Sequence, residues 1–150
     1  MQAINLAQQA YEQLIQTNYG QSAIMYQQLA EQEPDQFQHY WYLGIALLLA
    51  GDESAAQSAW FTPLLTGTDD STLTSDLVGV LAQEANRLEN FHPEFAYLLR
   101  CYLQEFDPGN LENGLHLLRL ALDQEQFSWE LPQIEFLPSL LEQTPSNIVN

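Results

Sequence analysis

Apolar side chains recur every three or four positions along much of this chain, which is the spacing of one face of a helix. The pattern is clear at Leu77, Val80, Leu81, Ala85 and Leu88, at Phe95, Leu98, Leu99, Tyr102, Leu103 and Phe106, and at Leu111, Leu115, Leu118 and Leu122. Residues suited to turns separate these segments, at positions 90–93 and 107–110. The pattern predicts an all-α protein.

Two more helices are predicted within residues 40–60, where the spacing has a steric meaning. Tyr40-x2-Leu43-Gly44-x2-Leu47 is followed, after a turn at Gly51-Asp52, by Ala56-x3-Trp60. The small residues Gly44 and Ala56 allow two helices to cross closely, and large side chains such as Trp60 fill the spaces beside the crossing. We therefore expect a helical hairpin whose structural residues are Tyr40, Leu43, Gly44, Leu47, Gly51, Ala56 and Trp60.

A weaker copy of this pattern lies one repeat length, about 34 residues, earlier in the chain. Its residues are Leu6, Ala10, Thr17, Ser22 and Tyr26. Two small residues, Ala10 and Ser22, are again followed by a large one, Tyr26. The sequence Glu33-Pro34-Asp35 is expected to end the second helix of this hairpin.

The repeat becomes less regular after Trp60. Pro63 is expected inside or at the end of a helix, and residues 67–72 are expected to form a polar loop. Ser75 or Asp76 is predicted to cap the next helix. That helix and the one after it, which ends at residues 107–110, are expected to form a third, degenerate hairpin.

The last part of the chain is predicted to form a helix over residues 111–122, a turn at residues 126–128 and a final helix from about Trp129 that Pro138 kinks or splits. The whole chain is then a single domain, residues 1–150, with repeats at 3–36, 37–70, 73–110 and 111–143. About eight helices would form a short right-handed α-solenoid of antiparallel hairpins. Residues 111–143 complete a fourth repeat or cap the third, and both alternatives stay open.

Residues 40–52 read Tyr-Trp-Tyr-Leu-Gly-Ile-Ala-Leu-Leu-Leu-Ala-Gly-Asp, and with Ala56 and Trp60 they resemble the tetratricopeptide repeat (TPR). The specific part of this resemblance covers residues 3–62. More narrowly, the chain is similar to glutamine-rich repeat segments of cyanobacterial proteins, which often precede a SPINDLY-type glycosyltransferase or an FkbM-type methyltransferase. The resemblance implies a scaffold that holds partner or substrate proteins, and it carries over no catalytic residue of either enzyme.

In the TPR family, the first helix of each hairpin lines a concave groove that holds the ligand. The resemblance assigns to this face Ala7, Tyr11, Trp41, Ile45, Leu48 and Leu81. Repeats that capture acidic chaperone tails need cationic residues there, and this chain contains no Lys. An apolar or basic peptide is therefore the expected ligand. For these aromatic and apolar side chains, burial against a neighbouring helix is an equally weighted alternative; they are Tyr11, Trp41, Ile45 and Leu48.

The excess of acidic over basic residues narrows the classes of partner that we expect. The chain carries 20 Asp and Glu against 3 cationic side chains, and its net charge is -17. Nucleic acids and anionic membrane surfaces are excluded as expected partners, because both are bound by clustered Lys and Arg. A basic protein surface would be attracted, although solubility alone is the simpler explanation of the charge.

Other features favour the cytoplasm. The apolar run at residues 44–51 is too short to span a membrane and is followed by Asp52 and Glu53. The single cysteine, Cys101, has no partner for an internal disulfide, and the first residues lack the basic region of a signal peptide.

No catalytic, cofactor-binding or metal-binding residue is predicted. His39, His92 and His116 are far apart, none is spaced with a cysteine as metal ligands are, and structural roles are favoured for all three. Cys101 lies beside Arg100, which allows a thiol of lowered pKa, but a small buried apolar residue is the favoured role. The sequence also lacks the patterns of a nucleophile elbow, a phosphate loop and an EF-hand.

Three functional hypotheses follow from these observations. The first is a non-catalytic module that binds a peptide or helix of a partner protein in a concave groove. The second is an accessory domain that presents substrates to a larger glycosyltransferase or methyltransferase. The third is an architectural homo-oligomer that self-associates through its aromatic surface.

Overall fold

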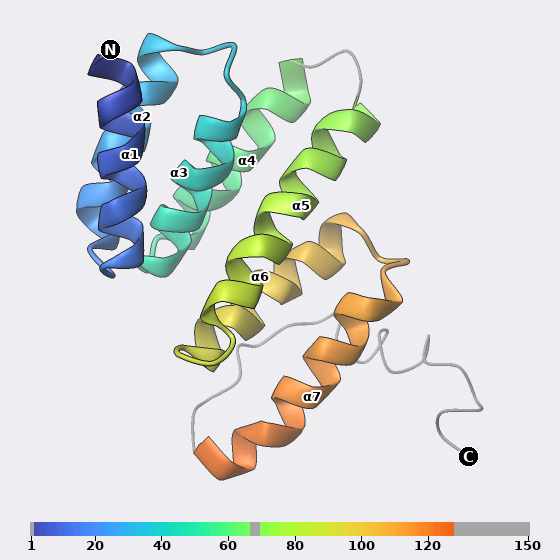
Figure 1. The fold of residues 1–150 in the computed structure, drawn as a ribbon. Coiled ribbons are helices and arrows are strands. Elements are labelled where there is room, and N and C mark those ends of the chain that lie inside the picture. The colour runs from blue at the N-terminus through green and yellow to red at the C-terminus, as the bar shows by residue number, and fades with distance from the viewer. Residues whose placement is uncertain (1, 67–69, 128–150) are drawn as a thin grey trace. The chain divides into compact units, whose positions relative to one another are not determined.

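The computed structural model describes residues 2–66 and 70–127, and these residues form helices and short connections without a strand. Figure 1 shows the helices in chain order: α1 (Gln2–Ile15), α2 (Tyr19–Gln32), α3 (Gln38–Leu49), α4 (Glu53–Thr66), α5 (Asp70–Leu88), α6 (Pro93–Phe106) and α7 (Leu111–Phe127). The all-α prediction is confirmed for this part of the chain. The eighth helix, expected from about Trp129, lies outside the described residues.

The chain divides into two compact units, Met1–Val80 and Leu81–Asn150, where the sequence suggested one domain. The division falls within α5, so the third hairpin expected over residues 73–110 is split between the units. Each unit is described separately below.

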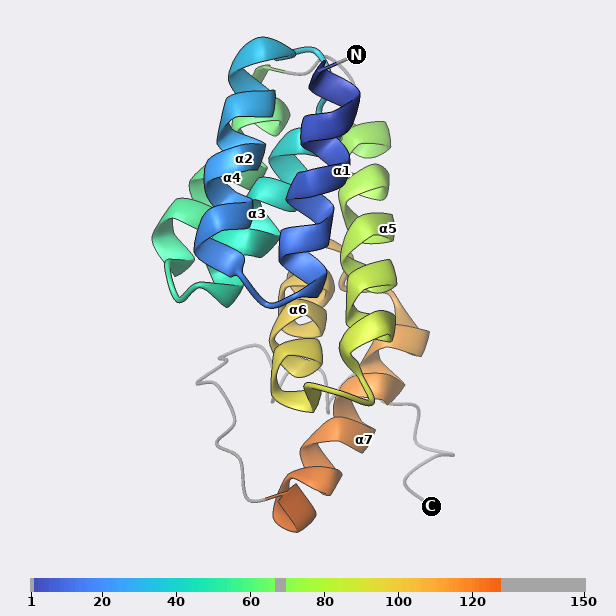
Figure 2. The ribbon, with the colours of Figure 1, turned by 60° about the vertical axis from the view of Figure 1, so that its left-hand side comes forward.

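In the first unit, α1 packs against α2, α2 against α3 and α3 against α4 (Figures 1 and 2). The turns between α1 and α2 and between α3 and α4 are three residues long, at 16–18 and 50–52, so each pair is a tight hairpin. The buried apolar side chains of these helices include Ala10, Leu14, Tyr26, Leu29, Trp41, Ile45, Ala56 and Trp60.

The two hairpins repeat in register. Their first helices end at Ile15 and Leu49, 34 positions apart. The second helices begin at Tyr19 and Glu53 and end at Gln32 and Thr66, and both pairs are again 34 positions apart.

The turns repeat with the same interval. Thr17 (φ 66°) and Gly51 (φ 98°), also 34 apart, are the two residues with left-handed backbone among those described. The amide of Asn18 donates to the Gln13 carbonyl at 2.8 Å, and that of Asp52 donates to the Leu47 carbonyl at 2.9 Å. Both turns are therefore Schellman motifs, which satisfy the last carbonyls of a helix through one left-handed residue.

The crossing of α3 and α4 depends on Gly44. A Cβ atom at this position would overlap Nε1, Cδ1 and Cε2 of the Trp60 indole, which lies directly against the glycine. The same indole donates a hydrogen bond from Nε1 to the carbonyl oxygen of Trp41 at 3.0 Å. In the first hairpin a different bond joins the helices, because the Ser22 hydroxyl donates to the Ala10 carbonyl at 2.8 Å.

Prolines set the ends of several helices. Glu33, His92 and Asp107 each precede a proline, and their backbone angles are nearly the same (φ -132°, -139° and -136°; ψ 66°, 72° and 71°). Proline disfavours helical geometry in the residue before it. The predicted ends of α2 at residues 33–35 and of α6 at residues 107–110 are confirmed.

The second unit contains the C-terminal part of α5 together with α6 and α7, and α6 packs against α7. Its buried apolar side chains include Leu81, Ala85, Leu88, Ala96, Tyr97, Leu99, Cys101, Leu103, Leu117 and Leu120. Asn110 caps α7, because its side-chain oxygen accepts a hydrogen bond from the Asn113 amide at 3.0 Å.

Two boundaries differ from the sequence expectation. Helix α5 begins at Asp70, so Ser75 and Asp76 lie inside the helix and do not cap it. The apolar spacing of α5 already begins at Leu73, four residues before Leu77, and this outweighs the polar composition that suggested a loop. Helix α7 continues to Phe127, so the turn expected at residues 126–128 is wrong for its first two residues. Pro63 lies inside α4, so the expectation that it falls inside or at the end of a helix is confirmed.

Candidate functional site

The structure buries most of the residues expected to line a groove. Trp41 is 2% exposed, Leu48 is 4% exposed, and Ile45 and Leu81 are fully buried. Side chains in the interior offer no surface to a ligand, which corrects the expected groove at these four positions. Helical spacing marks an apolar face, but that face can equally be the one that packs inside the protein.

The other two groove residues, Ala7 and Tyr11, are partly exposed. The Tyr11 ring meets the Tyr42 ring edge-on, with centroids 5.6 Å apart and an interplanar angle of 83°. Tyr42 in turn stacks on Tyr26 at 5.5 Å and 15°. Tyr11 is therefore part of an aromatic stack that joins α1, α3 and α2, and packing accounts for much of its surface.

Most of the residues assigned to the structural motif lie in the interior or in the turn of the α3–α4 hairpin. Leu43, Gly44, Ala56 and Trp60 are buried, and Gly51 forms the turn. Tyr40 and Leu47 are partly exposed.

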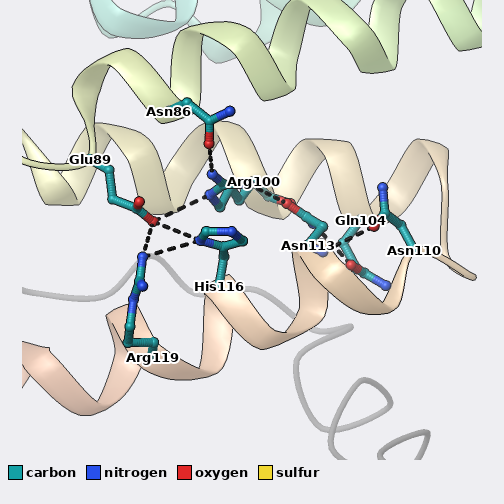
Figure 3. Close-up of polar contacts among 8 residues, drawn as sticks. All are labelled: Asn86, Glu89, Arg100, Gln104, Asn110, Asn113, His116 and Arg119. Carbon is teal, nitrogen blue, oxygen red and sulfur yellow. Dashed lines mark hydrogen bonds and ion pairs between the residues drawn. The ribbon is translucent and has the colours of Figure 1, made fainter.

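A polar site that the sequence did not predict lies in the second unit (Figure 3). We call Glu89, Arg100, His116 and Arg119 the Glu89 cluster. One carboxylate oxygen of Glu89, Oε1, is 2.7 Å from Arg119 Nη2, 3.0 Å from His116 Nδ1 and 3.8 Å from Arg100 Nε. Glu89 lies in the turn directly after α5, Arg100 lies in α6, and His116 and Arg119 lie in α7, so the cluster joins these three parts of the second unit.

The cations determine the ionisation of Glu89. Partial burial acts to raise the pKa of this carboxyl group, but hydrogen bonds from Arg119 and His116 and the charges of both arginines outweigh burial and lower the pKa. Glu89 is therefore an ionised acceptor at neutral pH and is unsuited to donate a proton in catalysis. Burial lowers the pKa of Arg100, and the charge of Glu89 opposes this effect.

His116 can serve only one neighbour with its Nδ1 atom. This nitrogen lies 3.0 Å from Glu89 Oε1 and 3.2 Å from Arg119 Nη2. A protonated Nδ1 donates to the carboxylate, whereas an unprotonated Nδ1 accepts from the guanidinium. Because Arg119 already donates to Glu89 at 2.7 Å, the first arrangement gives both Arg119 Nη2 and His116 Nδ1 an acceptor.

A second group of polar side chains continues from Arg100 into the interior. Arg100 Nη1 donates to Asn113 Oδ1 at 3.1 Å, and its Nη2 donates to Asn86 Oδ1. Asn113 Nδ2 donates to the Arg100 carbonyl and to Gln104 Oε1, both at 2.9 Å. Gln104 Nε2 donates to the Pro108 carbonyl at 2.8 Å. Arg100, Gln104 and Asn113 are all buried, so these bonds satisfy groups that water does not reach.

An open pocket of about 570 Å³ adjoins the Glu89 cluster. We call it the Phe91 pocket, and its lining residues are Glu89, Asn90, Phe91, Pro93, Arg119, Leu120 and Asp123. Phe91 is 77% exposed in the turn between α5 and α6, whereas Leu120 is 3% exposed. Apolar, acidic, basic and amide side chains thus line one place on the second unit.

The other residues considered for chemistry, Cys101, His39 and His92, lie in surroundings that indicate structural roles. Cys101 is fully buried, and burial raises the pKa of its thiol to about 12, so the favoured role as a small apolar residue is confirmed and the alternative of a lowered pKa is wrong. His39 Nε2 lies 2.8 Å from Glu33 Oε1 at the connection between α2 and α3. His92 lies 3.8 Å from Glu94 at the start of α6.

The described residues contain neither a metal-ligand cluster nor a membrane-spanning helix. No group of three or more His, Cys, Asp or Glu in residues 2–66 and 70–127 is placed to hold a metal ion. No helix in those ranges is long and apolar enough to cross a membrane.

One sequence signal pointed towards the Glu89 cluster. The only strongly basic side chains of the chain are Arg87, Arg100 and Arg119, and all three lie in the second unit. Each pairs with a glutamate, Arg87 with Glu84 at 2.8 Å and the other two with Glu89. Scarce cations that fall within one short stretch indicate specific ion pairs.

Family models, curated proteins and solved structures were compared with this chain, and none of the three comparisons gave a significant match.

Proposed function

We propose that this chain is a TPR-type interaction module that binds a peptide segment of a partner protein. The observation that carries the proposal is the 34-residue interval, which recurs in three helix boundaries and in the left-handed residues Thr17 and Gly51. An interval of 34 residues with two helices per unit is that of the TPR. Proteins of this kind stack hairpins into extended surfaces that bind other proteins.

The charge supports a basic or apolar ligand segment. A net charge of -17 attracts cationic surfaces and speeds their encounter at low salt. The burial of Trp41, Ile45 and Leu48 moves the expected contact surface away from these residues.

Selection of displayed peptides on the immobilised full chain, followed by calorimetric titration, tests this function. We expect enriched peptides rich in apolar residues and in Lys or Arg, with saturable one-to-one binding that weakens as salt is added. The same peptides should not bind the chain unfolded in urea. If no enriched peptide binds saturably to the folded chain, the proposal is wrong.

Self-association is a second candidate, favoured by large apolar side chains at the surface. Among the side chains that the structure describes, those at least 45% exposed are Ile15, Ile24, Phe61, Leu65, Phe91, Leu111, Leu115 and Leu122. Light scattering over a dilution series distinguishes this candidate, because a homo-oligomer loses mass on dilution. A monomer at every concentration excludes it.

A further inference from the structure

We propose that the Phe91 pocket binds a cationic side chain, arginine above all, of the partner peptide. This inference rests on the proposed interaction function and names one contact within it. The pocket volume of about 570 Å³ lies in the range of roughly 300–1,000 Å³ that is usual for pockets holding small ligands. It suits one or two side chains of an extended segment.

The charges of the lining select a cation. The one basic lining residue, Arg119, is neutralised by Glu89 at 2.7 Å, and His116 and Arg100 also face this carboxylate. Asp123 has no ion pair or hydrogen bond within the part of the chain that the structure describes. It therefore contributes to the pocket a negative charge that forms no ion pair with a described residue. An anionic ligand would meet this charge without a free cation to bind it.

The apolar part of the lining favours a planar cation. Phe91 is 77% exposed, and Pro93 and Leu120 add apolar surface to the same pocket. A guanidinium group can stack on a phenyl ring while its N–H groups bond a carboxylate, and a ring face adds roughly 0.5–1 kcal/mol at an exposed site. Phe91 thus offers a ring on which the planar guanidinium can stack, and Asp123 offers a carboxylate that its charged N–H groups can bond.

The polar neighbours also preorganise the pocket. Arg119 and Glu89 are held by their mutual ion pair, and Glu89 is held by His116 as well. Fixed side chains lose little conformational freedom on binding, which favours affinity.

The test uses two short peptides that differ at one position. Acetyl-Leu-Arg-Leu-amide is titrated into the ¹⁵N-labelled full chain, and the same peptide with citrulline in place of arginine is the neutral control of equal shape. We expect chemical-shift changes at the amides of Asn90, Phe91 and Asp123. Affinity for the arginine peptide should exceed that for the citrulline peptide by about threefold or more.

Matched variants locate the contact. Asp123→Asn and Phe91→Ala should each weaken the arginine peptide by about two- to fivefold and should leave the citrulline peptide nearly unchanged. Glu105→Gln, at an exposed position of α6 outside the pocket lining, removes the same charge and should change affinity by less than either variant.

Equal binding of the two peptides, or equal effects of Asp123→Asn and Glu105→Gln, would overturn the pocket assignment. If peptides selected on the full chain still bind saturably in that case, the interaction function stands and uses another surface. Absence of saturable binding by any peptide overturns both proposals.

Discussion

The indole ring of Trp60 occupies the space that a side chain on Gly44 would need. The absence of a side chain at Gly44 lets α4 approach α3 closely enough for the indole to donate its hydrogen bond to the Trp41 carbonyl at 3.0 Å. Packing and hydrogen bonding at this crossing therefore require that residue 44 has only a hydrogen atom as its side chain. A larger side chain there should destabilise the whole hairpin.

Gly44→Ala is expected to destabilise the protein by about 1–3 kcal/mol, because the new methyl group overlaps the indole ring. Gly79→Ala is the matched control, since it is also helical and a Cβ there would meet nothing within 4 Å. The control should gain about 0.5–1 kcal/mol from helix propensity. Urea unfolding followed by circular dichroism measures both, and a gain of stability at Gly44 would contradict the crossing described above.

Thr17→Gly is expected to stabilise the first hairpin. A branched residue at φ 66° is strained by about 1–2 kcal/mol, and glycine removes this strain at a smaller entropic cost in the unfolded chain. The net gain should be about 0.5–1 kcal/mol. Gly51→Ala makes the reverse change at the equivalent turn, where φ is 98°, and should lower stability by a similar amount. Changes of the same sign in the two variants would show that the turns are not equivalent.

Arg100→Met is expected to cost about 1–3 kcal/mol, because it leaves the side-chain oxygens of Asn86 and Asn113 without this donor. Arg119→Met removes a cation from the same carboxylate, but this side chain is 56% exposed, so the loss should stay within about 1 kcal/mol. The two unfolding free energies are compared under identical conditions. Equal losses would mean that the interior hydrogen bonds of Arg100 contribute nothing to the free energy of unfolding.

Acid should weaken the second unit through Glu89. Its pKa in the folded protein lies below the ordinary value of 4.5, so the unfolded chain binds the proton more readily. The stabilisation is complete above pH 4.5 and is lost as the pH falls through the lower, folded pKa. In Glu89→Gln the unfolding free energy should fall less steeply in this window than in the parent, whereas Glu105→Gln should keep the parent slope. Unfolding curves between about pH 3 and pH 7 provide the comparison.

The hairpins could be predicted from sequence because their determinants are local. Gly44, Ala56 and Trp60 lie within 17 residues of one another, and their spacing alone predicts which faces of the two helices are in contact. The Glu89 cluster could not be predicted in this way. Glu89 and His116 are 27 positions apart and meet only because α6 packs against α7.

The prediction of a groove shows a second limit of apolar periodicity along the sequence. The spacing of Trp41, Ile45 and Leu48 correctly marks one apolar face, but it carries no information about whether another element covers that face.

The start of α5 was predicted too late in the chain because local composition and apolar spacing indicate different structures there. Ser71, Thr72 and Thr74 are weak helix formers that suggest a loop, and the apolar face from Leu73 onward outweighs them.

Because the helix ends and the left-handed turn recur after 34 positions, residues 2–66 contain two helical hairpins joined in phase. A third copy spliced in at the connection after α2 would present to each neighbour the surface that the neighbour already recognises. Such a protein should fold with one more hairpin and a correspondingly larger unfolding enthalpy. The length of this part of the molecule is thus a quantity that gene duplication can adjust in whole steps without redesigning an interface.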